Sequence, residues 1–310
     1  LSAKSITAYR KLDADFSRDG DHSPFAISAY LDHMDLDQLS QEFQLNGDSM
    51  DSRLKWVLGL YYFEESGDNE NLLDFVMSQF RSGGAIDNRS WAAFFQGTYD
   101  LTDKWHLTAG LRYTDEEKKF RPDQVILLNK FAGSGHPLLD APFMQAGERI
   151  LPYLWKTQTI EEVTPMINLS YDWAEDLMVY GSYSEGFKSG GFTQRVFPPI
   201  VAGFTAPPGT PAIDLIPEFQ PEFVKVYELG LKHATPGRRL RVNGAVFSTK
   251  YDDLQVQVFT SVAPVTKNAA SATINGFELE MQAVPADGWF AEAAVGYLDA
   301  EYDDLDTLET

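Results

Sequence analysis

Between its turn-rich stretches, this chain alternates apolar and polar residues with a period of two. Before a turn at residues 100–104 the apolar parity carries Trp91 and Phe95, and after the turn the same parity carries Leu107 and Leu111. A period of two places successive side chains on opposite faces of a β-strand. One face of each strand is therefore apolar and the other polar, which is typical of an outer-membrane β-barrel with its apolar face against lipid.

Eleven such segments follow one another, and short and long connections alternate between them. The predicted strands span residues 2–11, 40–47, 53–63, 90–100, 105–115, 159–172, 177–186, 222–233, 239–251, 272–283 and 289–300. The short connections are residues 47–52, 101–104, 172–176, 234–238 and 284–288; the long ones are 12–39, 64–89, 116–158, 187–221 and 252–271. Outer-membrane barrels have short periplasmic turns and long extracellular loops. We therefore predict an all-β, antiparallel transmembrane barrel with the long connections outside.

Aromatic residues gather at both ends of the predicted strands. Tryptophans lie near the short turns and tyrosines toward the long connections: Trp56, Trp105, Trp173 and Trp289 at one end, and Tyr62, Tyr113, Tyr183 and Tyr297 at the other. Two rings of amphipathic aromatics suit the two membrane–water interfaces. The polar parity carries charges such as Arg112, which would cost roughly 2–4 kcal/mol at the midplane if it faced lipid. The polar face is therefore predicted to line the lumen.

Composition excludes several classes of protein. The chain has 310 residues, no cysteine and a net charge of −21. The negative charge argues against nucleic acid as a partner, and the lack of cysteine excludes disulfides and thiolate metal sites. No apolar run approaches the roughly 20 residues of a transmembrane helix. Because the chain starts at Leu1 and stops at Thr310 just after a strand, we interpret it as an internal fragment.

Four strand segments carry more specific information. They are residues 92–115, 179–192 (with Ser184-Glu-Gly-Phe187 at its outer end), 227–233 and 274–280. In this order they resemble the barrel strands of TonB-dependent receptors of the siderophore-receptor type. The resemblance implies a barrel of about 22 strands with a plugged lumen, in the outer membrane of a Gram-negative bacterium. Residues 1–310 would then be a partial barrel domain, about half of the whole.

The same resemblance implies a function. Receptors of this family take up a scarce nutrient, most often a ferric siderophore, driven by the TonB complex through a motif near the N-terminus. Neither that motif, nor the plug, nor the final strands with their terminal aromatic residue are found in this sequence. We expect no enzymatic activity and no cofactor, and we expect contact with outer-membrane lipid and lipopolysaccharide.

One segment stands out as a candidate ligand site, where a strand meets the outer vestibule. Phe187, Lys188, Phe192 and Arg195 combine aromatic surface with positive charge in an acidic protein. An anionic iron chelate would be attracted by the charge, and aromatic rings can stack on it. The glycines of the segment favour an alternative, in which they form a bend and the side chains are structural. Motifs of this kind are more often structural.

The first long connection is acidic, with seven aspartates: Asp13, Asp15, Asp19, Asp21, Asp32, Asp35 and Asp37. Carboxylates can hold Ca²⁺, but Arg18 stands where an EF-hand loop needs glycine. We expect a solvated loop face; bridging through divalent cations to lipopolysaccharide is an alternative.

His106 has a predicted strand position, in the lumen near the periplasmic end. No second histidine or carboxylate stands at ligand spacing beside it in the sequence, so no metal is assigned. The sequence also shows no Ser/His/acid grouping, nucleophile elbow or phosphate-binding loop.

The long connections contain further local patterns. Residues 120–123 and 254–259 read as extended, and the second is predicted to rise above the membrane and turn back. The proline-rich stretch 198–221 is predicted to contain no helix, whereas 72–80 is predicted to form a short amphipathic helix.

Two other classes of function stay open. A passive porin would share the barrel but lack energy coupling. A secreted adhesin or carbohydrate-binding module would use the apolar parity as the core of a β-sandwich.

Overall fold

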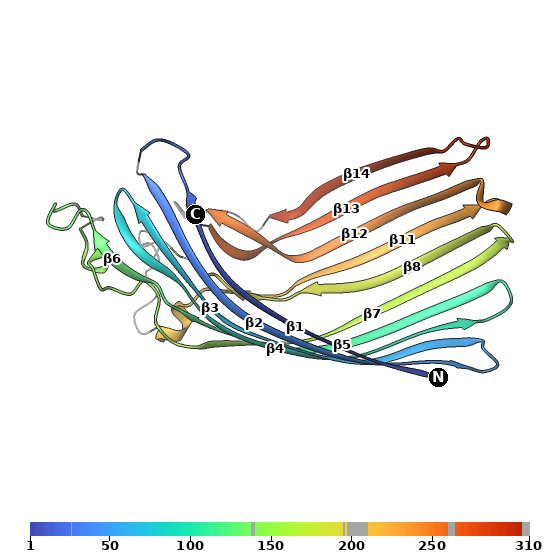
Figure 1. Ribbon diagram of the computed structural model, residues 1–310, viewed down its shortest axis with the longest axis horizontal. Coiled ribbons are helices and arrows are strands. Elements are labelled where there is room, and N and C mark those ends of the chain that lie inside the picture. The colour runs from blue at the N-terminus through green and yellow to red at the C-terminus, as the bar shows by residue number, and fades with distance from the viewer. Residues whose placement is uncertain (26, 138–139, 195, 197–209, 260–263, 306–310) are drawn as a thin grey trace.

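One antiparallel sheet dominates the protein and curves into an open half-cylinder (Figure 1). The computed structural model describes the chain except residues 26, 138–139, 195, 197–209, 260–263 and 306–310. Eleven strands follow one another around the wall in chain order, and β6 (Val125–Asn129) pairs with β4. The wall strands are β1 (Ser2–Asp19), β2 (Ser28–Ser49), β3 (Leu54–Phe75), β4 (Ser78–Asp100), β5 (Trp105–Pro122), β7 (Lys156–Ala174), β8 (Leu177–Lys188), β11 (Glu222–Ala234), β12 (Leu240–Phe259), β13 (Pro264–Ala283) and β14 (Ala291–Leu305).

All eleven predicted strands are present, and the short turns between them fall where the sequence places them. In Figure 1 the short turns lie at the right and the loop ends at the left. β1 and β14 are the two edges of the sheet, so the described part of the wall does not close. Within the described ranges, no helix is long and apolar enough to cross a membrane.

Most strands run far beyond their predicted outer ends. β1 continues to Asp19 and β2 begins at Ser28, so the connection predicted over 12–39 shrinks to residues 20–27. The pairing runs without a break from the turn end up to Asp19 opposite Ala29. The seven aspartates therefore belong mostly to paired strands, not to a loop. Cross-strand pairing overrides the low strand preference of aspartate.

The helix predicted over residues 72–80 is wrong. These residues form the tip of the β3–β4 hairpin, where Leu73 lies opposite Phe80. Both side chains are buried and pack with Tyr30, Phe75 and Met77. Apolar side chains on the two arms of the hairpin converge on one face, and this convergence produced the apparent helical spacing.

Two other local predictions fare better. Residues 254–259 form the outer end of β12, which turns back into β13. Residues 120–122 end β5. In the proline-rich stretch, the described residues form one 3₁₀ turn, Ala212–Leu215, and the short strand β10 (Glu218–Phe219). The prediction of no helix is therefore wrong at that one 3₁₀ turn. Residues 198–209 lie outside the described residues.

The two faces of the wall differ as the alternation predicts. On the outer face the Leu111 side chain is 53% exposed, and many other large apolar side chains of that parity are exposed as well. On the inner face the Arg112 guanidinium lies 5.6 Å and 5.7 Å from the ring centroids of Tyr61 and Phe94. An apolar band of this extent requires a covering, which a membrane's hydrocarbon supplies.

Aromatic pairs border this band on the outer face. Trp105 packs on Tyr171 at the turn end, with ring centroids 4.6 Å apart. Trp91 packs on Tyr113 at 5.3 Å, and Tyr183 on Tyr227 at 4.9 Å, toward the loop end. These positions agree with two rings, although their role at the membrane interfaces stays a prediction.

Candidate functional site

The segment that follows β8 leaves the wall and folds inward. Beyond Lys188 it forms β9 (Gly191–Phe192), which pairs with β10 so that Phe219 lies opposite Gly191. Glycine is required here, because a Cβ on Gly190 would lie 2.5 Å from the Phe219 carbonyl oxygen. The bend that the glycines predict is therefore present, and it creates a second layer inside the vestibule.

Wall side chains hold this inner layer through its backbone. Their amine and amide groups donate to its carbonyl oxygens, as expected where a loop lacks its own ladder partners. The donors and acceptors are Lys118 Nζ to Gly190 O (3.0 Å), Gln158 Nε2 to Phe219 O (3.0 Å) and Gln255 Nε2 to Ser189 O (2.9 Å).

A cavity of about 490 Å³ lies between the inner layer and the wall. Phe120 of β5 stacks on Phe192, with ring centroids 5.8 Å apart and planes 23° apart. Phe219, together with Met34 and Leu36 of β2, adds aromatic and apolar lining; Lys118 and Lys188 contribute amines, and Asp35 and Asp68 contribute carboxylates. Cavities of this size with a few polar groups are typical of small-molecule sites.

Burial changes the ionisation of two groups beside this cavity. Both lie beyond the Tyr113 end of the apolar band. Desolvation lowers the pKa of the Lys118 ammonium and raises the pKa of the Glu116 carboxyl. The Ser189 hydroxyl donates to Glu116. Lys188 differs, because its side chain is 64% exposed and its Nζ lies 3.8 Å from a Glu222 carboxylate oxygen. Lys188 therefore presents an accessible positive charge at the rim.

Of the four residues predicted to form a ligand site, the structure describes three, and two of these lie at the cavity. Lys188 and Phe192 border the cavity. Phe187 lies opposite Phe223 of β11, on the outer face of the wall, because it has the same parity as Tyr183. Its predicted place in the vestibule is therefore wrong. Arg195 lies outside the described residues.

Lys118, Phe120 and Phe219 are cavity residues that the sequence analysis did not identify. No alternation of apolar and polar residues marks the first two, because residues 115–119 are charged on both parities. They lie where β5 continues through Pro122, and even-numbered positions there still face the lumen. Phe219 has no sequence signal either, because its position depends on the inward fold of the chain.

His106 has carboxylate neighbours, contrary to the sequence-based expectation. Its Nδ1 lies 2.5 Å from Asp100 Oδ1, and its Nε2 lies 3.1 Å from Asp172 Oδ2. Asp172 comes from β7, so spacing along β5 could not reveal it. Both ring nitrogens are engaged, and we assign no metal. A larger hollow of about 920 Å³ lies nearby at the turn end, and its lining includes the charged residues Asp172 and Lys232.

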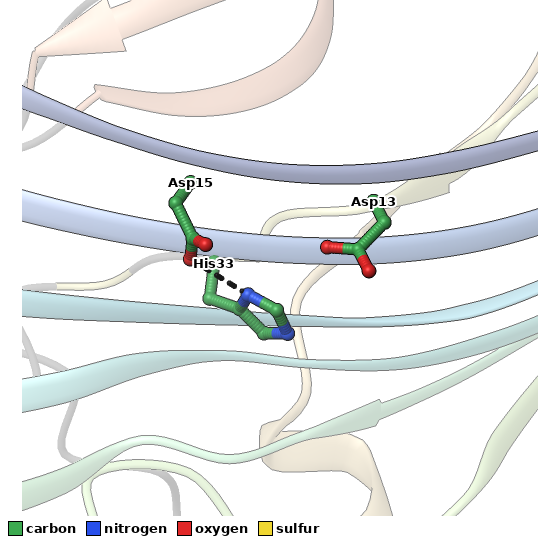
Figure 2. A group of neighbouring side chains, drawn as sticks. All are labelled: Asp13, Asp15 and His33. Atoms are coloured by element: carbon green, nitrogen blue, oxygen red, sulfur yellow. Dashed lines mark hydrogen bonds and ion pairs between the residues drawn. The ribbon is translucent and has the colours of Figure 1, made fainter.

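The acidic strands bring one group of possible metal ligands together. Asp13 and Asp15 of β1 and His33 of β2 place one donor atom each within 4.8 Å of one another. Figure 2 shows the Asp15 carboxylate directed at the His33 ring, where Oδ1 and Nδ1 lie 2.8 Å apart. This hydrogen bond raises the pKa of His33. All three side chains are exposed, as expected for a solvated face.

Comparison with known proteins decides the family. The family described as "TonB dependent receptor-like, beta-barrel" matches residues 1–309. The chain belongs to this family. TonB-dependent receptors are transport receptors of the outer membrane, so the sheet is part of the wall of an outer-membrane barrel.

Individual relatives match this chain over three quarters of its length or more. The pesticin receptor of Yersinia pestis is 25% identical over 234 residues, which are 75% of this chain and 29% of that receptor. The ferric yersiniabactin uptake receptor FyuA from Yersinia pestis has a TM-score of 0.75 at 19% identity, over 98% of this chain and 41% of that one. The siderophore receptor PiuA from Acinetobacter baumannii has a TM-score of 0.67 at 17% identity, over 98% and 45%. At these identities the solved structures establish the fold alone, and the chain spans less than half of each of these relatives.

Proposed function

We propose that the protein containing this chain is a receptor for energy-coupled uptake of a scarce nutrient, in the first place a ferric siderophore. The vestibule cavity is the observation that carries this proposal. It faces the cell exterior, has an aromatic lining, and presents the exposed ammonium of Lys188 at its rim. An anionic chelate with flat, conjugated iron-binding groups suits these features.

Transport in this proposal needs parts beyond the described wall. The described part of the wall does not close, and in this proposal residues 1–310 act as about half of a barrel whose lumen holds a plug. The chelate binds at the vestibule, and force from the TonB complex remodels the plug and releases the chelate inward. The step is a shift between two conformational states with no covalent chemistry, no cofactor and no enzymatic turnover.

The relatives support an iron chelate as the cargo. FyuA is named as a ferric yersiniabactin uptake receptor and PiuA as a siderophore receptor. A passive porin shares the wall but does not require TonB. The adhesin alternative needs a protein core against the apolar band, whereas that band is exposed on the described wall.

Uptake by whole cells tests the proposal. The full-length gene is expressed in a siderophore-uptake-deficient strain, and a panel of ⁵⁵Fe-loaded siderophores is offered at limiting concentration. We expect accumulation of at least one anionic chelate, abolished by deletion of tonB. Accumulation that persists without TonB would support the porin instead. No accumulation of any ferric chelate, with the receptor present at the surface, would refute the iron cargo.

A further inference from the structure

Three arginines gather on the outer face of the wall, beyond the apolar band. Arg81 comes from β4, Arg121 from β5 and Arg149 from the connection between β6 and β7. Arg121 follows Phe120, which faces the cavity, so alternation places Arg121 on the opposite face. Arg149 joins the cluster through a bridge between its backbone and Val125. This arginine cluster is separate from the vestibule cavity.

One carboxylate and one ring hold the arginine cluster together. Asp123 lies 3.1 Å from Arg81 Nη2 and 2.8 Å from Arg149 Nη1. The guanidinium carbons of Arg121 and Arg149 lie 4.5 Å and 4.4 Å from the ring centroid of Tyr153. The three guanidinium groups therefore occupy one small area of surface.

The three arginines of the cluster carry more positive charge than the neighbouring carboxylate neutralises. Within the part of the chain that the structure describes, Asp123 is the carboxylate paired with these arginines, and Arg121 has no carboxylate partner. The patch remains positive even if Glu148, next to Arg149 in sequence, is counted. Such a surplus is unexpected in a protein with a net charge of −21. Three guanidinium groups offer more donors than one carboxylate can accept, which suits a further anion.

Exposed rings lie beside this charge. Tyr153, Leu154 and Trp155 are each 44% exposed, and the Arg121 guanidinium lies 5.0 Å from the Trp155 ring centroid. An aromatic ring packs on the apolar C–H face of a sugar, while arginine forks bind phosphate oxygens. Together they fit a phosphorylated sugar better than a free anion, which would leave the rings uncovered.

The height of the cluster indicates where that sugar comes from. Arg121 lies eight residues beyond Tyr113 on β5, which is about 26 Å along a strand and about 20 Å above the outer aromatic ring for a tilted barrel strand. An outward-facing site at this level meets the saccharide layer of neighbouring lipids. We propose that Arg81, Arg121 and Arg149 bind phosphorylated sugars of the surrounding lipopolysaccharide. This site rests on the outer-membrane location of the family and not on the cargo.

Binding of a defined saccharide to the full-length receptor in detergent tests the proposal. The probe is a lipid-free, phosphorylated core oligosaccharide of lipopolysaccharide, compared with its dephosphorylated form and with inorganic phosphate. The variants are R121Q/R149Q and the matched control R89Q, which removes an exposed arginine from the outer parity of β4. Titration calorimetry without any iron chelate keeps the result independent of transport.

We expect the wild type and R89Q to bind the phosphorylated oligosaccharide alike, and R121Q/R149Q to bind it at least tenfold more weakly. Dephosphorylation should cause a similar loss in the wild type. Should the double variant fail to fold, judged by heat-modifiable gel mobility, R149Q alone decides, because Arg149 is exposed; a weakening of at least threefold is then expected. Equal binding by wild type and variants overturns the site. So does inorganic phosphate binding as tightly as the oligosaccharide, since that indicates a free-anion site.

Discussion

Phe120 of β5 and Phe192 of β9 stack with their ring centroids 5.8 Å apart, which joins the barrel wall to the inner layer. One ring comes from a regular strand and the other from a segment that leaves the sheet. Their contact forms one side of the vestibule cavity. The predictions that concern binding follow from this pairing of wall and inner layer.

Replacing Phe192 by alanine should weaken binding of the transported chelate. The chelate would lose one aromatic partner in the cavity. Because an aromatic pair contributes about 0.5–1.5 kcal/mol beyond its buried area, a loss of about 2- to 12-fold in affinity is expected from that contact alone. F187A is the matched control, because Phe187 lies on the outer face in the neighbouring strand. Fluorescence titration of the full-length receptor measures both. Equal losses of chelate affinity in the two variants would show that the inner layer does not contribute to the binding site.

Gly190→Ala should displace the inner layer while the wall stays folded. The new Cβ would lie 2.5 Å from the Phe219 carbonyl oxygen and 2.8 Å from the Gln158 side chain. At Gly244, by contrast, the nearest atom to a new Cβ is 3.5 Å away, an ordinary contact. We expect G190A to lose chelate affinity at least fivefold and G244A to keep it, with similar thermal unfolding of both barrels. A G190A receptor with unchanged affinity would show that the cavity walls do not bind the chelate.

Lys188→Gln should weaken binding of an anionic chelate in a salt-dependent manner. The Lys188 side chain is largely exposed, so its attraction is screened by ions as the Debye length falls to about 3 Å at 1 M salt. We expect a several-fold effect at low ionic strength that disappears at high ionic strength. Lys104→Gln, at a turn on the opposite end of the wall, serves as the control. A defect of constant size at all salt concentrations argues for a structural role of Lys188.

His33 should titrate above the ordinary value for histidine, because Asp15 accepts its hydrogen bond. Since the folded pKa is raised, this pair stabilises the fold below the unfolded pKa of about 6.5, and the contribution is lost as pH rises through the folded pKa. NMR of ¹³C-labelled histidine in the full-length receptor follows the titration. D15N should bring the pKa of His33 back toward its ordinary value, whereas D32N, on the opposite face of β2, should leave it raised. An unperturbed pKa in the wild type contradicts the geometry of Figure 2.

The order of the strands and the division into two faces could be predicted from sequence, because both follow from a period of two and from turn residues. The outer ends could not. Asp13, Asp35 and Glu70 belong to strands although aspartate and glutamate disfavour them, since partners across the sheet satisfy their backbones. Strand pairing over such distances is a property of neighbouring segments and leaves no local pattern.

The candidate site was predictable in part, for a similar reason. Lys188 and Phe192 could be identified because charged and aromatic residues are visible in the sequence, whereas the parity of β8 places Phe187 on the outer face. The partners Lys118 and Gln158 come from other strands and meet the segment only after it folds inward. The same holds for Asp172 beside His106.

The central claim is that the apolar face of this wall contacts lipid. Nitroxide labels at Leu107, Leu229 and Leu279, and at their inward-facing neighbours Thr108, Glu228 and Glu278, test it in the reconstituted full-length receptor. Power-saturation EPR compares collisions with bilayer-dissolved oxygen and with a water-soluble nickel chelate. The three leucine positions should be accessible to oxygen and the three neighbours shielded from it. If the leucine positions are shielded from oxygen while their neighbours are not, the wall does not face a membrane and the account is wrong.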